Sequence, residues 1–223
     1  MGEVLLVPFA MSILHMDRDL IKQQLKYTLE ETNYDDQGEL YRGKVRDNYI
    51  NEDTITMVTT DRISAFDRVL GTVPFKGQAL VELADWWFGE TADIVANHVR
   101  RRPHPNVWEV RRCQPIQVEM VVRGYITGVT STSAWTAYNK GERNFCGNEL
   151  ADGLRKNEKL PEPIITPSTK AAQGEHDESV APSELYKRGV IDPGLYKELA
   201  KISMRLYERG VSRAADQGLI FVD

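Results

Sequence analysis

Three stretches of the chain have the apolar spacing of amphipathic helices. In each of them apolar side chains recur every three or four positions, so that they fall on one face of a helix. The stretches are residues 17–31, 79–88 and 195–215. Gly218 follows the last stretch and is predicted to end it, because glycine readily adopts the backbone conformation that closes a helix.

Other stretches have strand patterns. Residues 40–50 predict two strands joined by a glycine turn, and the β-branched residues 54–60 predict a third strand. Residues 116–123 alternate between apolar and polar positions, as a half-buried strand does. The period of two along a strand places Glu119 and Arg123 on the same side of it.

Two stretches predict loops. Residues 100–112 are basic and contain prolines, which predicts a loop that leads into a strand. Residues 141–182 are rich in glycine, proline, asparagine and charged residues and have little periodicity. A loop of this length inside a compact domain is usually functional or disordered.

Apolar runs lie at both ends of the chain, and they predict different features. Residues 219–222 predict a buried strand, and a buried strand needs partners on both sides, so we expect a C-terminally truncated chain. Residues 1–15 lack the basic start and the cleavage site of a signal peptide and are too short to span a bilayer. We interpret them as an extension or tag, with Met16 as a natural start.

Composition and charge narrow the classes of function. Of the 223 residues, 41% are apolar and 27% are charged, which is ordinary for one large globular domain or two small ones. The net charge of −5 disfavours nucleic acid as a partner. The two cysteines, Cys113 and Cys146, form no CxxC pair, so we expect no disulfide framework, no zinc site and a cytoplasmic location.

A glycine turn near the N-terminus is the first candidate site. Gly38 and Gly43-Lys44 nearly match the P-loop pattern, but Val45 stands where that pattern needs Ser or Thr, and a strand follows instead of a helix. We therefore reject a P-loop. Two interpretations stay open: the backbone N–H groups cover phosphates while Lys44 and Arg46 supply charge, or the turn is an ordinary hairpin with solvated cations.

Three other places combine polar residues in ways that suit ligand binding. Asp61–Asp67 follows a predicted strand, where sheets often bind ligands, although a capped turn explains it as well. Arg123 suits bidentate binding of phosphate or carboxylate, and Gly124 after it lets backbone approach a ligand closely. Lys170 and His176-Asp177-Glu178 either stabilise charge near a reacting carboxylate or form a flexible charged loop.

Two cationic features have simpler explanations. Lys76 lies in a predicted turn over residues 74–77, and a loop with one cation explains it on its own. The arginines of residues 100–102 and 111–112 could bind the phosphates of a polymer. The acidic balance of the chain and the interrupting prolines favour a solvated loop face instead.

Taken in order, the motifs resemble the SAICAR synthetase (phosphoribosylaminoimidazole-succinocarboxamide synthase) family over roughly residues 39–223. The stretches that carry the resemblance are Leu40–Asp47, Asp61–Asp67, Lys76-Gly77, Glu119–Gly128, Leu160–Pro163, Thr166–Lys170, His176–Glu178 and Gly218–Asp223. The resemblance implies an α+β fold of two lobes: a β-rich N-terminal ATP-binding lobe over residues 16–115 and an α/β substrate lobe, C-terminally incomplete, over residues 116–223.

The resemblance also implies a reaction. The family is a carbon–nitrogen ligase of de novo purine biosynthesis, which joins carboxyaminoimidazole ribotide (CAIR) to L-aspartate with ATP and Mg²⁺. Phosphoryl transfer to the CAIR carboxylate forms an acyl phosphate, and the aspartate amine then displaces phosphate to give SAICAR. The expected partners are these small molecules, with no nucleic acid and no membrane, and a homo-oligomer is compatible with the sequence.

Site residues follow from the same resemblance, position by position. Those expected to bind the ATP phosphates are Gly43, Lys44 and Arg46; those expected to bind substrate are Ser64, Asp67, Lys76, Arg123 and one hydroxyl among Thr130, Ser131 and Ser133; and those expected near the reacting groups are Glu119, Lys170 and Asp177. Asp223 alone remains of an acidic metal-binding region, so we expect the 223-residue chain to bind ATP–magnesium poorly and to be nearly inactive.

Two alternatives to the ligase remain open. A small-molecule kinase would also use a glycine turn over ATP, and it would release ADP without aspartate. A nucleic-acid-binding module built on the arginines of residues 100–112 would bind RNA in a salt-sensitive way.

Overall fold

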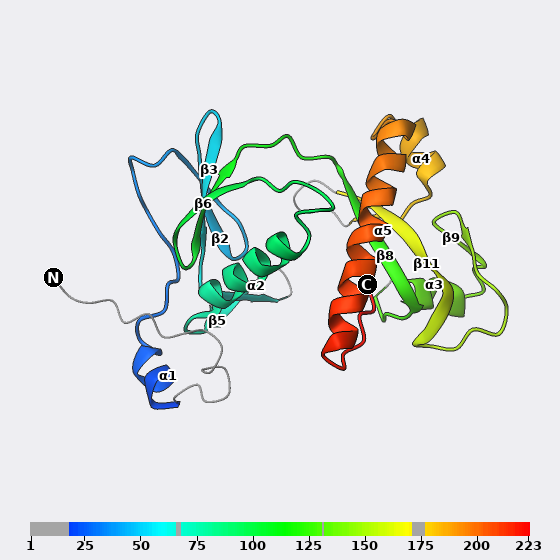
Figure 1. Ribbon diagram of the computed structural model, residues 1–223, viewed down its shortest axis with the longest axis horizontal. Coiled ribbons are helices and arrows are strands. Elements are labelled where there is room, and N and C mark those ends of the chain that lie inside the picture. Colours follow the sequence, from blue (N-terminus) through cyan, green and yellow to red (C-terminus); the bar gives the residue numbers. More distant parts are fainter. Residues whose placement is uncertain (1–17, 66–67, 131, 171–176) are drawn as a thin grey trace. The chain divides into compact units, whose positions relative to one another are not determined.

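The computed structural model of the chain describes residues 18–65, 68–130, 132–170 and 177–223. The chain divides into two compact units: unit 1 contains the residues up to Glu90 with Asn97–Cys113, and unit 2 contains Thr91–Ala96 with Gln114–Asp223. Helices and strands are mixed, so the α+β fold class is confirmed (Figure 1). No helix in the described stretches is both long enough and apolar enough to cross a membrane.

Unit 1 is built on an antiparallel sheet of five strands in the spatial order β1-β2-β3-β7-β6. The strands are β1 (Glu39–Arg42), β2 (Arg46–Ile50), β3 (Thr54–Thr59), β6 (Val99–His104) and β7 (Val107–Arg111). β1 pairs with β2 from Glu39 opposite Ile50 to Arg42 opposite Asp47, so the turn between them spans residues 43–45. The two strands and the turn predicted over residues 40–50 are confirmed, as is the strand that follows them.

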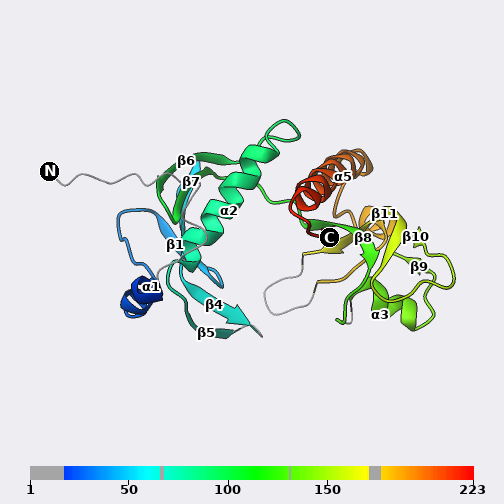
Figure 2. The same ribbon diagram turned by 60° about the horizontal axis from the view of Figure 1, so that its bottom comes forward.

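Helix α2 (Lys76–Glu90) covers one face of this sheet (Figures 1 and 2). Its Val81 packs with Trp108 of β7 in a buried apolar cluster. The helix begins where a carboxylate oxygen of Asp61 accepts a hydrogen bond from the backbone N–H of Gly77 at 3.0 Å. The predicted helix is confirmed, and it starts earlier than its apolar spacing indicates because a side chain from the end of β3 caps it.

The N-terminal helix is shorter than the sequence predicts. α1 (Arg18–Gln24) has no buried residue, so no packing against a core extends it. Beyond it, the backbone N–H groups of Leu29 and Thr32 donate to the carboxylates of Asp61 (2.9 Å) and Asp47 (2.7 Å). The prediction of a helix over this part of the chain is wrong, because these tertiary hydrogen bonds outweigh helical propensity.

The basic stretch is a β-hairpin, not a loop. β6 and β7 pair with each other, and Arg101 on β6 donates to Glu109 on β7 with an Nε–Oε2 distance of 2.9 Å. Arg102 donates to Glu82 of α2 at 3.0 Å between Nη1 and Oε2. The prediction of a loop is therefore wrong for β6, because acids on neighbouring elements pair with its arginines.

The remaining strands of unit 1 form a separate hairpin. β4 (Arg62–Ala65) and β5 (Arg68–Thr72) pair only with each other, and their register is irregular between Ile63 and Ser64 (Figure 2). β4 follows β3 almost directly, so the side chains of residues 60–62 lie at the junction of the hairpin and the main sheet.

Unit 2 is built on two long antiparallel strands, β8 (Val118–Ile126) and β11 (Glu158–Thr169). β11 contains Pro161 and Pro163, which cannot donate to a strand partner, and its register shifts between Lys159 and Ile164 so that both fall in the irregular part. The strand predicted over residues 116–123 is confirmed as β8.

Three helices pack around these strands. α3 (Ala134–Asn139) packs with β9 (Asn144–Phe145) and with the end of β8. α4 (Pro182–Lys187) packs with the start of β8, and α5 (Pro193–Asp216) lies along β8 (Figure 1). Asp192 caps α5 by accepting hydrogen bonds from the backbone N–H groups at its start. The helix predicted over residues 195–215 is confirmed as α5.

Two predictions in unit 2 are wrong. The predicted loop over residues 141–182 contains β9, β10 (Asn148–Glu149) and β11, and α4 begins at its last residue. The long strand β11 was missed because its irregular register accommodates prolines that obscure the strand pattern. The predicted buried strand over residues 219–222 is not a strand, and Leu219 and Ile220 are 66% and 72% exposed. One backbone hydrogen bond, from Gly124 to Val222 at 3.0 Å, ties this segment to β8.

Candidate functional site

The β1–β2 turn of unit 1 carries the first group of predicted site residues. Gly43, Lys44 and Val45 form the turn, and Arg46 begins β2. The side chains of Lys44 and Arg46 are exposed, so both charges lie at the surface of the unit. The turn is closed by a hydrogen bond from the backbone N–H of Gly43 to the carbonyl of Arg46 at 2.8 Å.

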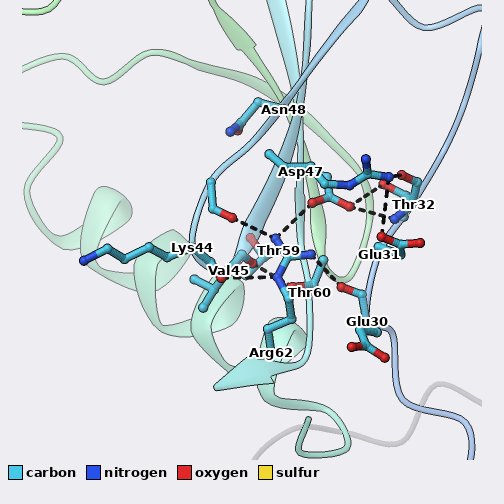
Figure 3. A network of polar contacts seen from close by, with 12 residues as sticks. Glu30, Glu31, Thr32, Lys44, Val45, Asp47, Asn48, Thr59, Thr60 and Arg62 are labelled. Carbon is cyan, nitrogen blue, oxygen red and sulfur yellow. Dashed lines mark hydrogen bonds and ion pairs between the residues drawn. The ribbon is translucent and has the colours of Figure 1, made fainter. Parts of the chain in front are cut away.

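The carbonyl oxygens of this turn are held by the segment that follows β3 (Figure 3). Arg62 donates from Nη2 to the Gly43 carbonyl at 3.0 Å and from Nε to the Lys44 carbonyl at 3.2 Å. The backbone N–H and the hydroxyl of Thr60 donate to the Val45 carbonyl at 3.0 Å and 2.9 Å. Three consecutive carbonyls therefore face residues 60–62, and the conformation of the turn depends on them.

Glycine at position 43 is not required by the packing of the turn. An added Cβ would meet no atom closer than the Arg46 carbonyl at 3.4 Å, and the φ angle of Gly43 is not in the left-handed region. Since neither sterics nor backbone conformation explains the glycine, it leaves room for a group that approaches the backbone from outside. A phosphate over the turn is such a group.

The second predicted segment, Asp61–Asp67, is only partly described. Ser64 lies half-buried on β4, and Asp67 lies outside the described residues. Lys76 is the first residue of α2 and is half-buried, and Gly77 after it approaches the end of β3 so closely that a Cβ would collide with a backbone carbonyl there. Residues 59–62 thus contact both the glycine turn and the start of α2.

The positive charge of Arg46 affects one histidine of unit 1. The ring of His98 packs edge-on against Phe88, with 6.0 Å between the ring centroids. Burial, and then the positive charge of Arg46, lowers the pKa of His98 below its ordinary value. Both effects favour the neutral imidazole of His98 at pH 7.

In unit 2, Arg123 is positioned by the β8–β11 pair. Its Nε donates to the hydroxyl of Thr166 at 2.9 Å, and its Nη1 lies 3.3 Å from a carboxylate oxygen of Asp223. The side chain of Arg123 is 14% exposed and that of Asp223 45%. The arginine is therefore fixed through one side of its guanidinium, and its contact with an exposed carboxylate is one that an anionic ligand can replace.

Gly124 has a structural explanation that differs from the predicted one. The hydroxyl of Tyr207 on α5 occupies the place that a Cβ on Gly124 would take. Packing of Tyr207 therefore explains the glycine without a ligand, and the predicted approach of a ligand to its backbone stays a prediction.

The predicted catalytic residues of unit 2 lie at the far end of the β8–β11 pair. Lys170 and Glu119 form an ion pair with 3.5 Å between Nζ and Oε1, and both side chains are about half exposed. Asp177 is exposed and precedes Glu178, whose carbonyl accepts a hydrogen bond from the backbone N–H of Thr169 at 2.9 Å. Because residues 169 and 178 pair in antiparallel fashion, the backbones at Lys170 and Asp177 come next to each other in space.

Among the hydroxyl groups predicted to bind substrate, that of Ser133 is buried and already hydrogen-bonded within the chain. It is the N-cap residue of α3, where it donates to the Thr130 carbonyl at 2.9 Å and accepts from the backbone N–H of Thr136 at 3.4 Å. Ser131 lies outside the described residues. Capping α3 therefore already employs the Ser133 hydroxyl.

Asp223 does not by itself make a metal site. Mg²⁺ is held by several oxygen ligands, usually carboxylates together with nucleotide phosphates. Within the stretches that the structure describes, no group of three or more His, Cys, Asp or Glu side chains is arranged to hold a metal ion. The described residues therefore do not fit a protein-built magnesium site.

Sequence reasoning singled out Ser64 and Asp67 in the Asp61–Asp67 segment and missed Arg62. Arg62 is 6% exposed and contacts the glycine turn directly. The sequence does hold one indication of a buried arginine here, since Arg62 comes shortly after a β-branched strand that is expected to be buried. Arginine is almost never buried without partners, so a buried Arg62 needs an acidic residue close by. Asp47, on β2 and fully buried, is that acidic partner.

Comparisons with known proteins agree on one family. A family model of SAICAR synthetase matches residues 39–223. The chain is 50% identical over 182 residues to the chloroplastic phosphoribosylaminoimidazole-succinocarboxamide synthase of Vigna aconitifolia, covering 82% of this chain and 53% of that protein. It is 48% identical over 186 residues to the corresponding synthase of Legionella pneumophila (strain Lens), covering 83% of this chain and 59% of that protein.

Solved structures are similar to this chain as well. The SAICAR synthase from Saccharomyces cerevisiae complexed with SAICAR has a TM-score of 0.73 and 30% sequence identity, covering 85% of this chain and 67% of that one. The chain spans about half the length of the curated relatives that it matches in plants. Because the family model matches most of the chain and includes each of the site residues described above, the chain belongs to the SAICAR synthetase family.

Proposed function

We propose that the protein to which this chain belongs joins CAIR to L-aspartate in a reaction that converts ATP to ADP and phosphate. The observation that carries the proposal is the family match over residues 39–223, which includes the glycine turn, Arg123, Lys170 and Asp223. The geometry of the β1–β2 turn supports it, since Gly43 leaves space that the fold does not use.

The reaction has two steps whose atoms balance. A carboxylate oxygen of CAIR attacks the γ-phosphorus of ATP, the bond from that phosphorus to the bridging oxygen breaks, and ADP leaves. The aspartate amine then attacks the acyl carbon, inorganic phosphate leaves with its bonding electron pair, and the amine loses a proton. The enzyme contributes positioning and neutralisation of charge, because the reactants are all anionic.

Each unit is described by its own group of proposed binding residues. In unit 1, Gly43, Lys44 and Arg46 bind the ATP phosphates, and Ser64, Asp67 and Lys76 contact substrate. In unit 2, Arg123 binds the ribotide, exchanging its contact with Asp223 for the ligand, and a hydroxyl among residues 130, 131 and 133 completes that site. Glu119, Lys170 and Asp177 lie near the reacting groups, with Lys170 stabilising negative charge as the acyl phosphate forms.

Magnesium has no residue-built site in the described stretches, so we derive no step through it. Asp223 is the proposed contribution of this chain to a metal bound with the ATP phosphates. We further propose a cytoplasmic location; some relatives that the chain matches are chloroplastic by name.

The test is ADP release by the full-length gene product, with each substrate omitted in turn. ADP release that needs both CAIR and aspartate supports the ligase. ADP release that continues without aspartate supports a small-molecule kinase and contradicts the proposal. The change Arg123→Lys should raise the KM for CAIR at least tenfold, because lysine cannot make the bidentate contact. Arg143→Lys, on an exposed arginine that pairs with Asp152, is the matched control in the same unit.

A further inference from the structure

Arg62 joins the glycine turn to the N-terminal segment of unit 1. Besides the carbonyls of Gly43 and Lys44, its guanidinium donates from Nη1 to the Glu30 carbonyl at 2.6 Å and from Nη2 to the Asp47 carboxylate at 2.9 Å. Figure 3 shows this guanidinium between the turn on one side and residues 30–32 on the other. Its donors are therefore directed at four acceptors, three within residues 43–47 and one at residue 30.

Asp47 fixes the guanidinium in this position. Asp47 is 0% exposed, and its second carboxylate oxygen accepts hydrogen bonds from the backbone N–H of Thr32 at 2.7 Å and from the Thr32 hydroxyl at 3.0 Å. The Tyr49 hydroxyl donates in turn to the Thr32 hydroxyl at 2.8 Å. A buried ion pair with hydrogen bonds on both partners has one favourable arrangement, because every change leaves a buried charge without a partner.

The hydrogen bonds from Arg62 determine where the amides of the turn point. The chain has no cis peptide in its described residues, and in a trans peptide the C=O and the following N–H point in opposite directions. Because the Gly43 carbonyl faces Arg62, the N–H of Lys44 points away from it. The Lys44 carbonyl also faces Arg62, so the N–H of Val45 points away too. Figure 3 shows the Lys44 side chain extending away from the guanidinium as well.

We propose that Arg62 is a positioning residue, which orients the Lys44 and Val45 amides of the β1–β2 turn toward the phosphates of a nucleotide. The inference deepens the proposed function and rests on its claim that this turn binds ATP phosphates. Successive backbone N–H groups that point to one side form an anion-binding concavity. Arg62 itself faces the carbonyl side of the turn and does not touch the phosphate.

Arginine is needed at this position, and lysine does not replace it. The planar guanidinium presents donors in fixed directions, so it can bond the Gly43 and Lys44 carbonyls and the Asp47 carboxylate together. A lysine ammonium keeps the charge but is a single compact group on a flexible stem. Arg62→Lys should therefore preserve the ion pair with Asp47 and lose the hydrogen bonds to the Gly43 and Lys44 carbonyls.

The experiment measures the turn with and without nucleotide in the full-length gene product, because the 223-residue chain is expected to bind nucleotide poorly. Residual dipolar couplings of the backbone N–H groups in unit 1 report the orientation of the Lys44 and Val45 amides, and an ADP titration followed by amide shifts reports binding. In Arg62→Lys we expect changed couplings confined to the turn and a Kd for ADP raised at least tenfold. Arg101→Lys, on an exposed arginine paired with Glu109, should match the unchanged protein in both measurements.

The outcomes separate this inference from the function on which it rests. If the amides of residues 43–46 do not shift when ADP is added to the unchanged full-length protein, the phosphate role of the turn fails, while the couplings still test Arg62. If Arg62→Lys folds and both its couplings and its Kd equal those of the unchanged chain, the positioning role is overturned.

A second variant covers the case in which Arg62→Lys does not fold. Thr60→Val keeps the size of a fully buried side chain and removes one hydrogen bond to the Val45 carbonyl. It should shift the couplings of the turn and weaken ADP binding several-fold. Unchanged couplings and an unchanged Kd in this variant would overturn the proposal in that case.

Discussion

The hydroxyl of Tyr207 fills the space beside Gly124 that any larger residue would need. The tyrosine also donates to the Phe221 carbonyl at 3.3 Å, so α5, β8 and the C-terminal segment meet at this point. Burial raises the pKa of Tyr207, with smaller contributions from Tyr125 and Asp223, so the hydroxyl keeps its proton at neutral pH.

Gly124→Ala should destabilise the chain because the new methyl group overlaps this hydroxyl. We expect the free energy of unfolding to fall by about 1–3 kcal/mol, as in other overpacked interiors. Urea unfolding of Gly124→Ala, Tyr207→Phe and the double variant measures the effect, and the phenylalanine should recover part of the loss. Gly89→Ala, on α2 with open space around it, should be neutral or stabilising. Equal stability of Gly124→Ala and the unchanged chain would contradict the contact.

Gly43→Ala should separate ligand binding from folding. The fold leaves room for a Cβ at this position, so the urea midpoint should stay within experimental error of the unchanged chain. A phosphate over the turn would meet the methyl group, so the Kd for ADP should rise at least tenfold. Isothermal titration with ADP checks this. An unchanged Kd would mean that the glycine serves neither the fold nor the nucleotide.

Asp47→Ala should be among the most damaging single changes in unit 1. It leaves the buried guanidinium of Arg62 without its counter-charge and the Thr32 N–H without its acceptor. Breaking a buried pair from one side costs about 3–5 kcal/mol. Thermal or urea unfolding measures the loss, and Arg101→Ala at an exposed pair should leave the midpoint almost unchanged. A small effect of Asp47→Ala would show that the pair is dispensable.

Glu82 should contribute stability that depends on pH. Hydrogen bonds from Arg102 hold the pKa of Glu82 below its ordinary value of 4.5, against the opposing effect of burial. A lowered carboxyl pKa gives stability that is fully present above pH 4.5 and is lost as the pH falls through the lowered pKa. The difference in urea midpoint between the unchanged chain and Glu82→Gln should therefore shrink below pH 4.5. Glu52→Gln, at an exposed turn, controls for the loss of one charge. A difference that stays constant from pH 7 to pH 3 would contradict this linkage.

The two cysteines should differ in reactivity. Burial raises the pKa of Cys146 to about 11, whereas Cys113 is exposed. The thiolate is the reactive form, and at pH 8 only about a thousandth of Cys146 would carry it. Labelling with iodoacetamide should modify Cys113 at least a hundred times faster. The variant Cys113→Ser, which retains Cys146 alone, should react slowly when folded and readily in urea. Fast labelling of folded Cys113→Ser would show that Cys146 is accessible.

The apolar pattern predicts elements well where one face packs on the rest of the same unit. β2 and β8 bury alternating residues, α2 and α5 place apolar residues in buried clusters, and each of these elements was predicted. Prediction failed where partners remote in sequence decide the local structure. Residues 29–32 are not helical because Asp47 and Asp61 bind their backbone, and β6 is a strand whose arginines pair with Glu82 and Glu109.

The candidate site divides in the same way. The motifs around Lys44, Arg123 and Lys170 could be found from residue types and order, because their chemistry is visible in the sequence. The sequence could indicate that Arg62 needs a partner such as Asp47, but it could not indicate the contact with the turn. The other three acceptors are backbone carbonyls, and a carbonyl has no signature in the sequence. The packing reason for Gly124 could not be found either, because Tyr207 is far away along the chain.

By itself the sequence determined the α+β class, the family and the list of chemically able residues, because these depend on local periodicity and on motifs in a fixed order. Only the tertiary structure decided which groups face one another: that the carbonyls of the β1–β2 turn face Arg62, and that the space beside Gly124 is filled while that beside Gly43 is open. The physical reason is that hydrogen-bond direction and steric overlap are properties of distances between atoms, and folding sets those distances between residues that the sequence keeps apart.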